Sequence, residues 1–165
     1  NTIGCMEFGG TLLNKRHNRT NDGGTIRKTT DVFQLATAVL YQNPIQNFAL
    51  APNNLTDAPA LAIDFMKEVP TTWDETVFLD GYPGKYCVLA RRHGDRWYVV
   101  GVNSDNKPLF LKLDLSRFIS QGREYKYYSD TKELLIQLKV IKALCPDKVE
   151  VTIQSNGGMV IVCNL

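Results

Sequence analysis

YCVLARRHGDRWYVVGVN, residues 86–103, carries the clearest structural signal in this chain. Two runs of mostly apolar and aromatic residues, 86–90 and 97–102, flank a segment that contains glycine and aspartate. That arrangement is typical of a β-hairpin. Because successive side chains of a strand point to opposite faces, we expect Trp97 and Tyr98 to lie on different sides of a sheet.

The same two-residue periodicity continues through the rest of the second half. Further short strands are predicted over residues 108–113, 124–128, 148–153 and 158–162. The segments between them, such as NSDNK, SQGRE and QSNGG, are rich in turn-forming Gly, Asp and Asn. Six or more strands at this spacing predict an antiparallel β-sandwich. Residues 131–144, TKELLIQLKVIKAL, fit either a helix or two β-runs, and we favour strand because the flanking segments are strands.

Before about residue 70 the periodicity is helical instead. Thr29 and Thr30 are good N-cap residues, and Asp31 follows them where a helix dipole favours negative charge. Apolar residues then recur at helical spacing until Pro44 ends the pattern. These residues are Val32, Leu35, Ala36, Val39 and Leu40.

A second, shorter helix is predicted from about residue 59 to residue 67. Asp57 can cap this helix, and Pro59 suits its first turn. Its apolar side consists of Leu61, Ala62, Phe65 and Met66. The predicted fold class is therefore mainly β with a helical N-terminal part.

The composition argues against two kinds of partner. The 165 residues are 44% hydrophobic and 22% charged, which is ordinary for a globular protein. The formal charge is only +2, from 19 Lys and Arg against 17 Asp and Glu, so no nucleic-acid partner is indicated. No apolar run approaches the ~20 residues that span a bilayer, and no segment resembles a signal peptide. We therefore predict neither a nucleic-acid nor a membrane partner.

The segment ARRHGDRWYV combines basic and aromatic residues in a way that could suggest nucleic-acid binding. RHGD reads as the turn of the hairpin, however, and a turn places its charges in water. We therefore expect Arg91, Arg92 and Arg96 to be solvated.

The four cysteines are Cys5, Cys87, Cys145 and Cys163. Their spacing contains no Cys-x-x-Cys motif, and the two histidines do not complete a zinc site. A disulfide between Cys87 and Cys163 requires neighbouring strands. Small buried thiols in strands are the favoured alternative.

The first half of the chain does not contain enough apolar sequence for a core of its own. Two short helices are preceded by a long polar segment, TLLNKRHNRTNDGGTIRKTT, at residues 11–30. Segments of this kind inside compact domains are usually functional or disordered. We expect this half to be the end of a larger domain, and the chain to be a fragment of a longer protein.

Four segments of the chain together resemble the C-terminal end of glycoside hydrolase family 97. They are NTIGCMEF, TTDVFQLATAVLYQNPIQNFALAPNNL, DFMKEVPTTWDETVFLDGYPGKYCVLARRHGDRWYVVGVN and VTIQSNGGMVIV. The most specific part is VPTTWDET…GYPGKY…ARRHGDRWYVVGVN, in which Pro, Trp, Gly and Arg fall at the spacings of the family. The resemblance covers nearly the whole chain.

This resemblance implies an enzyme with an N-terminal β-supersandwich, a central (β/α)8 barrel and a C-terminal β-sandwich linked with oligomerisation. Such enzymes hydrolyse α-glucosides or α-galactosides, with inversion or retention, and hold a calcium ion near the catalytic carboxylates. They are exported, usually periplasmic, proteins. An α-glucoside is favoured as the substrate. Residues 1–70 would then be the end of the barrel and residues 71–165 the sandwich.

By the same resemblance, the catalytic carboxylates and calcium ligands lie upstream of residue 1, so no catalytic or metal-binding residue is expected here. Glu7 is the best candidate for a substrate contact, because TIGCMEF resembles a barrel strand that ends at the active site. Glycoside hydrolysis needs two carboxyl groups, about 5 or 6.5–9.5 Å apart. Glu7 has no evident partner, because Asp22 and Asp31 belong to a loop and a helix start. A structural ion pair is the alternative.

Candidate site residues in the second half have simpler explanations. Asp74 and Glu75 are adjacent and point to opposite faces of an extended segment, so they cannot form a catalytic pair. Trp73 is expected to seal a junction between domains. Tyr125 and Tyr127 share a face of a strand, which leaves a stand-alone carbohydrate-binding or oligomerisation module as the alternative function.

Assembly is expected from the apolar faces of the two helices. Their burial is worth ~1.5–3 kcal/mol per large side chain, so a monomer that exposes all of them would be unstable. The helices must fold back on the sandwich or pair with a second copy. We expect a homo-oligomer in which the helical half contributes to an interface.

Overall fold

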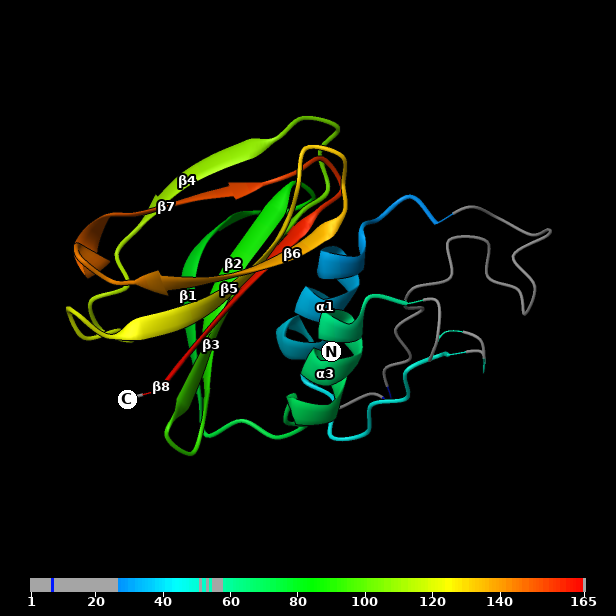
Figure 1. Ribbon diagram of the computed structural model, residues 1–165, viewed down its shortest axis with the longest axis horizontal. Helices are drawn as coiled ribbons and strands as arrows, with labels where there is room; N and C mark the ends of the chain where they lie inside the picture. The colour runs from blue at the N-terminus through cyan, green and yellow to red at the C-terminus, as the bar shows by residue number, and fades with distance from the viewer. Residues whose placement is uncertain (1–6, 8–26, 51, 53, 55–57, 165) are drawn as a thin grey trace.

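The computed structural model of the chain describes residues 7, 27–50, 52, 54 and 58–164. Two α-helices precede eight β-strands in this part of the chain (Figure 1). The helices are α1 (Asp31–Leu40) and α3 (Ala60–Glu68). The strands are β1 (Glu75–Tyr82), β2 (Tyr86–His93), β3 (Arg96–Asn103), β4 (Leu109–Leu113), β5 (Glu124–Asp130), β6 (Ile136–Lys142), β7 (Val149–Ile153) and β8 (Gly158–Asn164). A short 3-10 helix, η1 (Pro146–Lys148), leads into β7.

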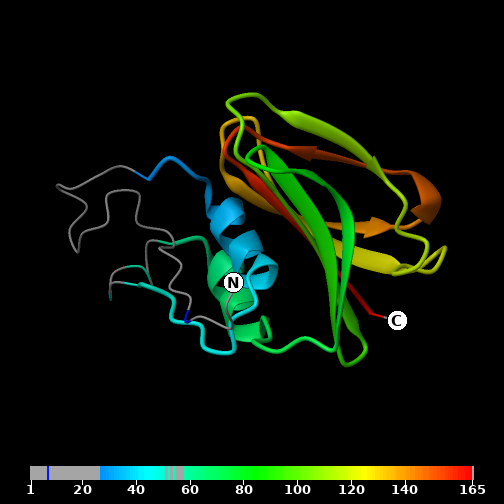
Figure 2. The ribbon, with the colours of Figure 1, turned by 180° about the vertical axis from the view of Figure 1, so that it is seen from behind.

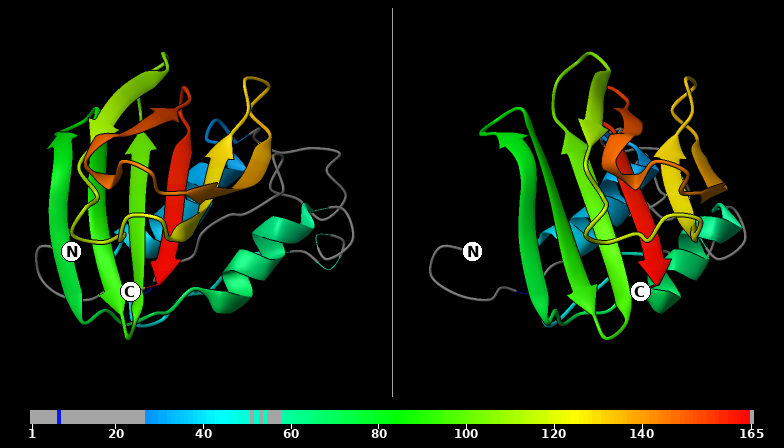
Figure 3. Two further views of the ribbon diagram at one scale, coloured as in Figure 1. Left: turned by 60° about the vertical axis from the view of Figure 1, so that its left-hand side comes forward. Right: turned by 90° about the vertical axis from the view of Figure 1, so that its left-hand side faces the viewer.

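The strands form two antiparallel sheets. Six of them pair in the order β1-β2-β3-β8-β5-β6, while β4 and β7 form a separate two-stranded sheet. Figures 1 and 2 show the helices on one side of the six-stranded sheet and the two-stranded sheet on the other. Figure 3 views the molecule with the two-stranded sheet in front. The predicted fold class, a mainly β antiparallel sandwich preceded by helices, is confirmed.

The hairpin predicted from residues 86–103 is β2 and β3. Arg92 pairs with Trp97 and His93 with Arg96, so the turn consists of Gly94 and Asp95. Gly94 has φ 57°, a left-handed conformation that glycine adopts without steric cost. This is the primed type of turn geometry that fits the twist of two antiparallel strands.

The alternation along β3 divides its side chains between two cores. Trp97 and Val99 lie in the core between the sheets, whereas Tyr98 and Val100 lie in the core under the helices. The predicted alternation is thus confirmed. The inter-sheet core also contains Val88, Ala90, Leu113, Leu115, Phe118, Ile119, Tyr125, Val149, Val151, Ile153, Met159, Ile161 and Cys163.

Helix α1 begins and ends as the sequence predicts. Thr30 is its N-cap, and the Thr30 hydroxyl accepts a 3.1 Å hydrogen bond from the amide of Phe33. The helix stops at Leu40, before Pro44. Helix α3 starts at Ala60, with Pro59 in the cap position and no side-chain cap bond. Asp57, the expected cap, lies outside the described residues.

Both helices pack on the six-stranded sheet of their own chain. Val32, Leu35 and Val39 are fully buried, and Phe65 is 3% exposed. The ring of Phe65 meets that of Tyr128 on β5 edge-on, with centroids 5.3 Å apart. Of the two outcomes that the sequence allowed, the helices therefore fold back on the sandwich. Their apolar faces no longer give a reason for the helical half to form an interface.

The strand favoured for residues 131–144 is confirmed, as the single strand β6 after a turn rather than as two β-runs. One strand was missed. Strand β1 was not predicted, because Val77, Phe78 and Leu79 are consecutive apolar residues without alternation. The structure shows a register shift between Phe78 and Asp80, and Phe78 is 66% exposed. A bulge of this kind hides the two-residue period.

The described cysteines are all free thiols. Cys87 packs with the core under the helices, and Cys163 lies in the core between the sheets. The two side chains are on opposite faces of one sheet, so the alternative of a disulfide between them is wrong. The expectation of buried thiols holds for Cys163, but Cys87 is only half-buried and Cys145 is exposed. Cys5 lies outside the described residues.

The contact between α1 and β8 depends on the absence of a side chain at Gly158. A methyl group added there would lie 2.5 Å from the carbonyl oxygen of Val32 and 2.6 Å from the amide nitrogen and Cα of Phe33. These are backbone atoms of the first turn of α1, and they cannot rotate away. The helix therefore lies directly against the strand at this point.

We predict that Gly158→Ala displaces the first turn of α1 and lowers the free energy of unfolding by about 2–3 kcal/mol, as overpacking does. Chemical denaturation measures the loss, and faster amide hydrogen exchange in α1 locates it. Gly84→Ala is the control, because a methyl group there meets nothing within 4 Å and only the cost of its φ of 76° remains. Equal losses in the two variants would contradict the close contact.

Candidate functional site

Glu7 is exposed, and its carboxylate accepts a hydrogen bond from the side-chain amide of Asn47. Within the described part of the chain it forms no ion pair. Asp31, considered as a partner, is bound instead by Arg27, and Asp22 lies outside the described residues. A carboxylate that accepts from an amide can also accept from a sugar hydroxyl, but one carboxylate does not hydrolyse a glycoside.

The adjacent carboxylates of the second half have structural partners, as expected. Asp74 accepts a 2.8 Å hydrogen bond from the amide of Gly94 and so fastens the β2–β3 turn. Glu75 pairs with Arg92 at 3.5 Å and with Arg117 at 2.5 Å. These bonds link the start of β1 to the β2–β3 hairpin and to Arg117, which gives both acids a structural role.

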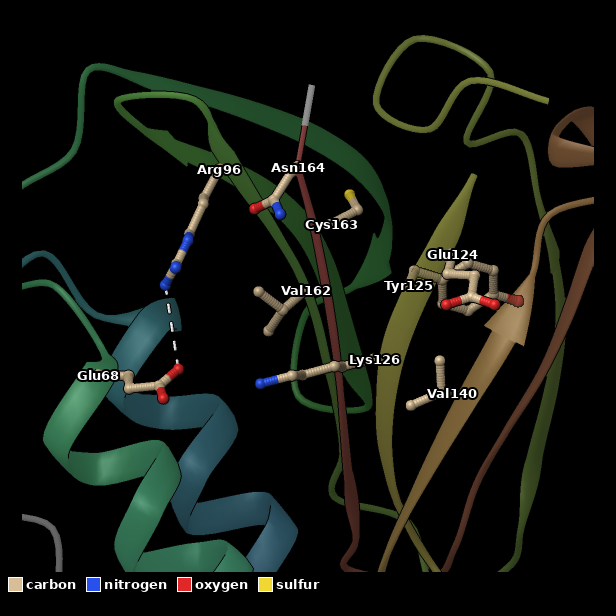
Figure 4. Close-up of a pocket in the computed structure, with 9 residues that line it drawn as sticks. All are labelled: Glu68, Arg96, Glu124, Tyr125, Lys126, Val140, Val162, Cys163 and Asn164. Carbon is tan, nitrogen blue, oxygen red and sulfur yellow. Dashed lines mark ion pairs between the residues drawn. The ribbon is translucent and has the colours of Figure 1, made fainter. Parts of the chain in front are cut away.

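A hollow of about 320 Å³ opens at one end of the six-stranded sheet (Figure 4). It arises because β5 and β8 pair only from Lys126 opposite Val162 to Ser129 opposite Met159, and then separate. Figure 4 shows Glu68, at the end of α3, in an ion pair with Arg96 at the start of β3. The charged groups are 3.9 Å apart.

The groups around this hollow are poorly suited to catalysis. The side chains of Glu68 and Arg96 are 56% and 51% exposed, and solvent-exposed pairs contribute about 0–1 kcal/mol. The thiol of Cys163 also borders the hollow. Burial raises the pKa of Cys163 to about 12, so the thiol stays protonated and is not a nucleophile at neutral pH.

A buried carboxylate joins the start of α1 to the sheet. Asp130, at the end of β5, is 4% exposed. It accepts hydrogen bonds from the hydroxyl of Thr30 at 2.8 Å and from the amide of Gly158 at 3.0 Å. The amide of Thr30 in turn donates to the carbonyl of Asn156 at 3.1 Å. Burial raises the pKa of Asp130 to about 6, although both hydrogen bonds oppose the rise.

A buried guanidinium holds the other end of α1. Arg91 is 5% exposed and donates a 3.1 Å hydrogen bond to the carbonyl of Tyr41, the C-cap of the helix. Its guanidinium also lies 5.7 Å from the ring centre of Trp73, a cation–π arrangement. Burial lowers the pKa of Arg91. The expectation that Arg91 is solvated in a turn is therefore wrong, whereas Arg96 is exposed as expected.

The role of Trp73 follows from its two ring contacts. Besides Arg91, it meets the ring of Tyr98 edge-on, with centroids 5.4 Å apart. The side chain thus closes the core between the helices and the sheet, which agrees with its expected sealing role. Sequence reasoning missed Asp130 and Arg91, although strand alternation places Asp130 on the same face as Tyr128.

No metal site is found in the described part of the chain. There, no group of three or more His, Cys, Asp or Glu side chains is placed to hold an ion. Calcium needs six to eight oxygen ligands, so the calcium that the resemblance implies does not fit the residues described here. Among the same residues, no helix is long and apolar enough to cross a membrane.

The described residues thus form a β-sandwich with two docked helices and no catalytic constellation. A sequence model described as "Glycosyl-hydrolase 97 C-terminal, oligomerisation" matches residues 72–164, more than half of the chain. The chain therefore belongs to glycoside hydrolase family 97, as the C-terminal oligomerisation domain with the segment before it.

Two curated relatives are galactosidases. The chain is 39% identical over 103 residues to a probable retaining α-galactosidase of Streptomyces bingchenggensis, a match that covers 61% of this chain and 15% of that protein. It is 44% identical over 69 residues to a retaining α-galactosidase of Bacteroides thetaiotaomicron, covering 42% of this chain and 10% of that protein. The chain spans only a small part of either relative.

Two solved structures show the same fold. A β-arabinopyranosidase superposes with a TM-score of 0.92 and 60% identity, over 99% of this chain and 26% of its own. A family 97 enzyme of Pseudoalteromonas sp. strain K8, solved with panose, superposes with a TM-score of 0.74 and 28% identity, over 96% of this chain and 26% of its own. The resemblance inferred from the sequence is confirmed.

The raised pKa of Asp130 predicts how stability changes with pH. The group titrates near 3.8 when unfolded and near 6 when folded, so the folded state binds more protons between these values. Stability from this group is complete below about pH 4 and is lost as the pH rises through about 6. We predict that wild type loses up to about 3 kcal/mol relative to Asp130→Asn over this range.

Urea denaturation of both proteins from pH 4 to pH 8 measures this difference. The amide oxygen of the variant can still accept the bonds from Thr30 and Gly158, so only the charge is removed. Asp64→Asn, at an exposed position of α3, serves as the control. Parallel pH profiles for wild type and Asp130→Asn would contradict the prediction.

Proposed function

We propose that the chain is the C-terminal part of a longer glycosidase of family 97 that hydrolyses α-galactosides or β-L-arabinopyranosides. One observation carries the proposal: 60% identity, over 99% of this chain, with a β-arabinopyranosidase. The two curated relatives are retaining α-galactosidases. A β-L-arabinopyranoside has the ring configuration of an α-D-galactoside and lacks only its hydroxymethyl group, so one site shape suits both sugars.

This substrate class differs from the α-glucoside that we expected from the sequence. The family 97 enzyme solved with panose is only 28% identical to this chain. The proteins named for galactosides or arabinopyranosides are 39–60% identical. The higher identities support the galactose-type ring.

We propose that residues outside this chain supply the chemistry. A retaining enzyme needs two carboxyl groups about 5–5.5 Å apart. The partner of Glu7 is the side-chain amide of Asn47 and not a second carboxyl group, so Glu7 does not form such a pair here. Glu7 would contact substrate only in the intact enzyme, at the end of a barrel formed partly by residues 1–70. Calcium would be held by upstream residues, and the enzyme would be exported, usually to the periplasm. Residues 71–165 would support structure and assembly.

Hydrolysis of p-nitrophenyl glycosides tests the substrate class. The longer protein should turn over the α-galactoside or the β-L-arabinopyranoside faster than the α-glucoside, and the 165-residue chain alone should not exceed the blank. Preference for the α-glucoside would contradict the proposed substrate. Turnover by the isolated chain that disappears in Glu7→Gln would overturn the assignment of catalysis to other residues.

We also propose that the sandwich assembles as a homo-oligomer through an edge of its six-stranded sheet. The matched family is described as an oligomerisation domain, and the helix faces are already buried within the chain. The edge strands are β1 and β6. The bulge after Phe78 disturbs β1, whereas β6 pairs regularly with β5 along its whole length. Regular edges pair with further strands more readily than bulged ones.

Sedimentation velocity at micromolar concentration tests the assembly. We expect a mass of at least two 18.6 kDa chains. Val140, on β6, is 62% exposed, and Val140→Glu should favour the monomer by placing like charges at a symmetric contact. Phe78→Glu, 66% exposed on β1, is the matched control and should leave the mass unchanged. A monomeric wild type would contradict the proposal.

A further inference from the structure

The inner face of β5 and β6 is polar where a sandwich is usually apolar. Tyr127 pairs with Lys139, and Ser129 pairs with Gln137, so these four side chains share one side of the sheet. The ring of Tyr127 also packs against the inter-sheet core, which identifies this side as the inner one. The two-stranded sheet contains only β4 and β7. Ser129 is buried, Gln137 is half-buried and Lys139 is exposed, so this face meets solvent mainly along β6.

A groove of about 640 Å³ lies between this face and β7. Thr152 and Gln154 form its wall on the β7 side. Tyr127 lines the groove, and its hydroxyl donates a long, 3.4 Å hydrogen bond to the carbonyl of Thr152. Volumes of 300–1,000 Å³ are typical of small-molecule sites in proteins.

The lining groups match the hydrogen bonding of a sugar. Gln137 donates to the buried hydroxyl of Ser129 at 3.1 Å, which fixes the amide at the groove floor. Amides and hydroxyls of this kind both donate and accept, as the hydroxyl groups of a sugar do. At the rim, Phe110 is 74% exposed and offers an aromatic face to the C–H side of a pyranose ring.

The charges of the groove indicate a neutral ligand. Two lysines, Lys132 and Lys139, line it together with Glu150. Asp130 also borders the groove, but its carboxyl group is buried and bound to Thr30 and Gly158. Glu150 is also paired with Lys112 at 3.3 Å, outside the groove lining. Lys132 and Lys139 are both exposed, so solvent and salt screen their charges and leave little attraction for a phosphate.

We propose that this groove is a saccharide-binding site, separate from the catalytic site of the enzyme, that holds a neutral oligosaccharide with galactose-type or arabinopyranose units. The choice of sugar rests on the proposed function, but the presence of a saccharide site rests on the groove itself. Bound at this position, a sugar chain is tethered to the sandwich while another part of it is hydrolysed elsewhere in the protein.

Binding is tested on the 165-residue chain by NMR titration of its backbone amides with melibiose, L-arabinose and maltose. We expect saturable shifts in β5, β6 and β7 with melibiose or L-arabinose. Shifts in these strands with maltose alone would support a saccharide site. They would contradict its preference for a galactose-type sugar and its link to the proposed substrate. Shifts confined to other parts of the chain, or none with any sugar, would overturn the site. This titration measures binding and not hydrolysis. Its result therefore tests the saccharide site independently of the proposed enzymatic reaction.

Two substitutions locate the ligand. Phe110→Ala and Gln137→Ala should each weaken binding about tenfold, the scale expected for one ring contact or one buried hydrogen bond. Phe78→Ala and Gln121→Ala are matched controls at exposed positions outside the groove, and both should bind as wild type does. Equal affinity in all four variants would contradict the assignment of binding to this groove.

Discussion

Hydrogen bonds from a buried carboxyl group and a buried guanidinium group of one sheet hold the two ends of helix α1, and the arrangement of the layers depends on this attachment. Asp130, from β5, accepts a hydrogen bond from the N-cap residue Thr30, and Arg91, from β2, donates to the carbonyl of the C-cap residue Tyr41. Each charge has the sign that the helix dipole favours at that end. A buried charge without a partner would cost several kcal/mol. The ends of the helix supply hydrogen-bond partners for the two buried side chains of the sheet, and these side chains satisfy polar groups at the ends of the helix.

This attachment makes the helices part of the same folded unit as the sandwich. Gly158 allows the first turn of α1 to lie against β8, and Trp73 closes the other end beside Arg91. The core under the helices combines residues from both parts of the chain. The apolar faces of the helices are therefore buried within the chain, which is why we propose assembly through an exposed edge of the sheet.

Much of this fold could be predicted, because it depends on local signals. Gly94 marks a turn, Thr30 caps a helix, and the period of two identifies most strands. The position of Arg91 could not be predicted in this way. RRHGDR looks like a solvated turn in the sequence, but the pairing register places Arg91 within β2, opposite Tyr98. Only the packing of α1 on that face decides that its charge is buried.

The groove beside β5, β6 and β7 was harder to predict than the fold, because polar residues occupy its inner-face positions. Tyr127 and Ser129 alternate into the interior as strand geometry requires, and an interior position normally predicts an apolar residue. The second sheet has only two strands, and on β6 the inner-face side chains of Gln137 and Lys139 are half-buried and exposed. Ser129 is buried there, and its hydroxyl is stable because it accepts a hydrogen bond from Gln137. The two-stranded sheet thus completes the core beneath it, and the groove lies beside its strand β7.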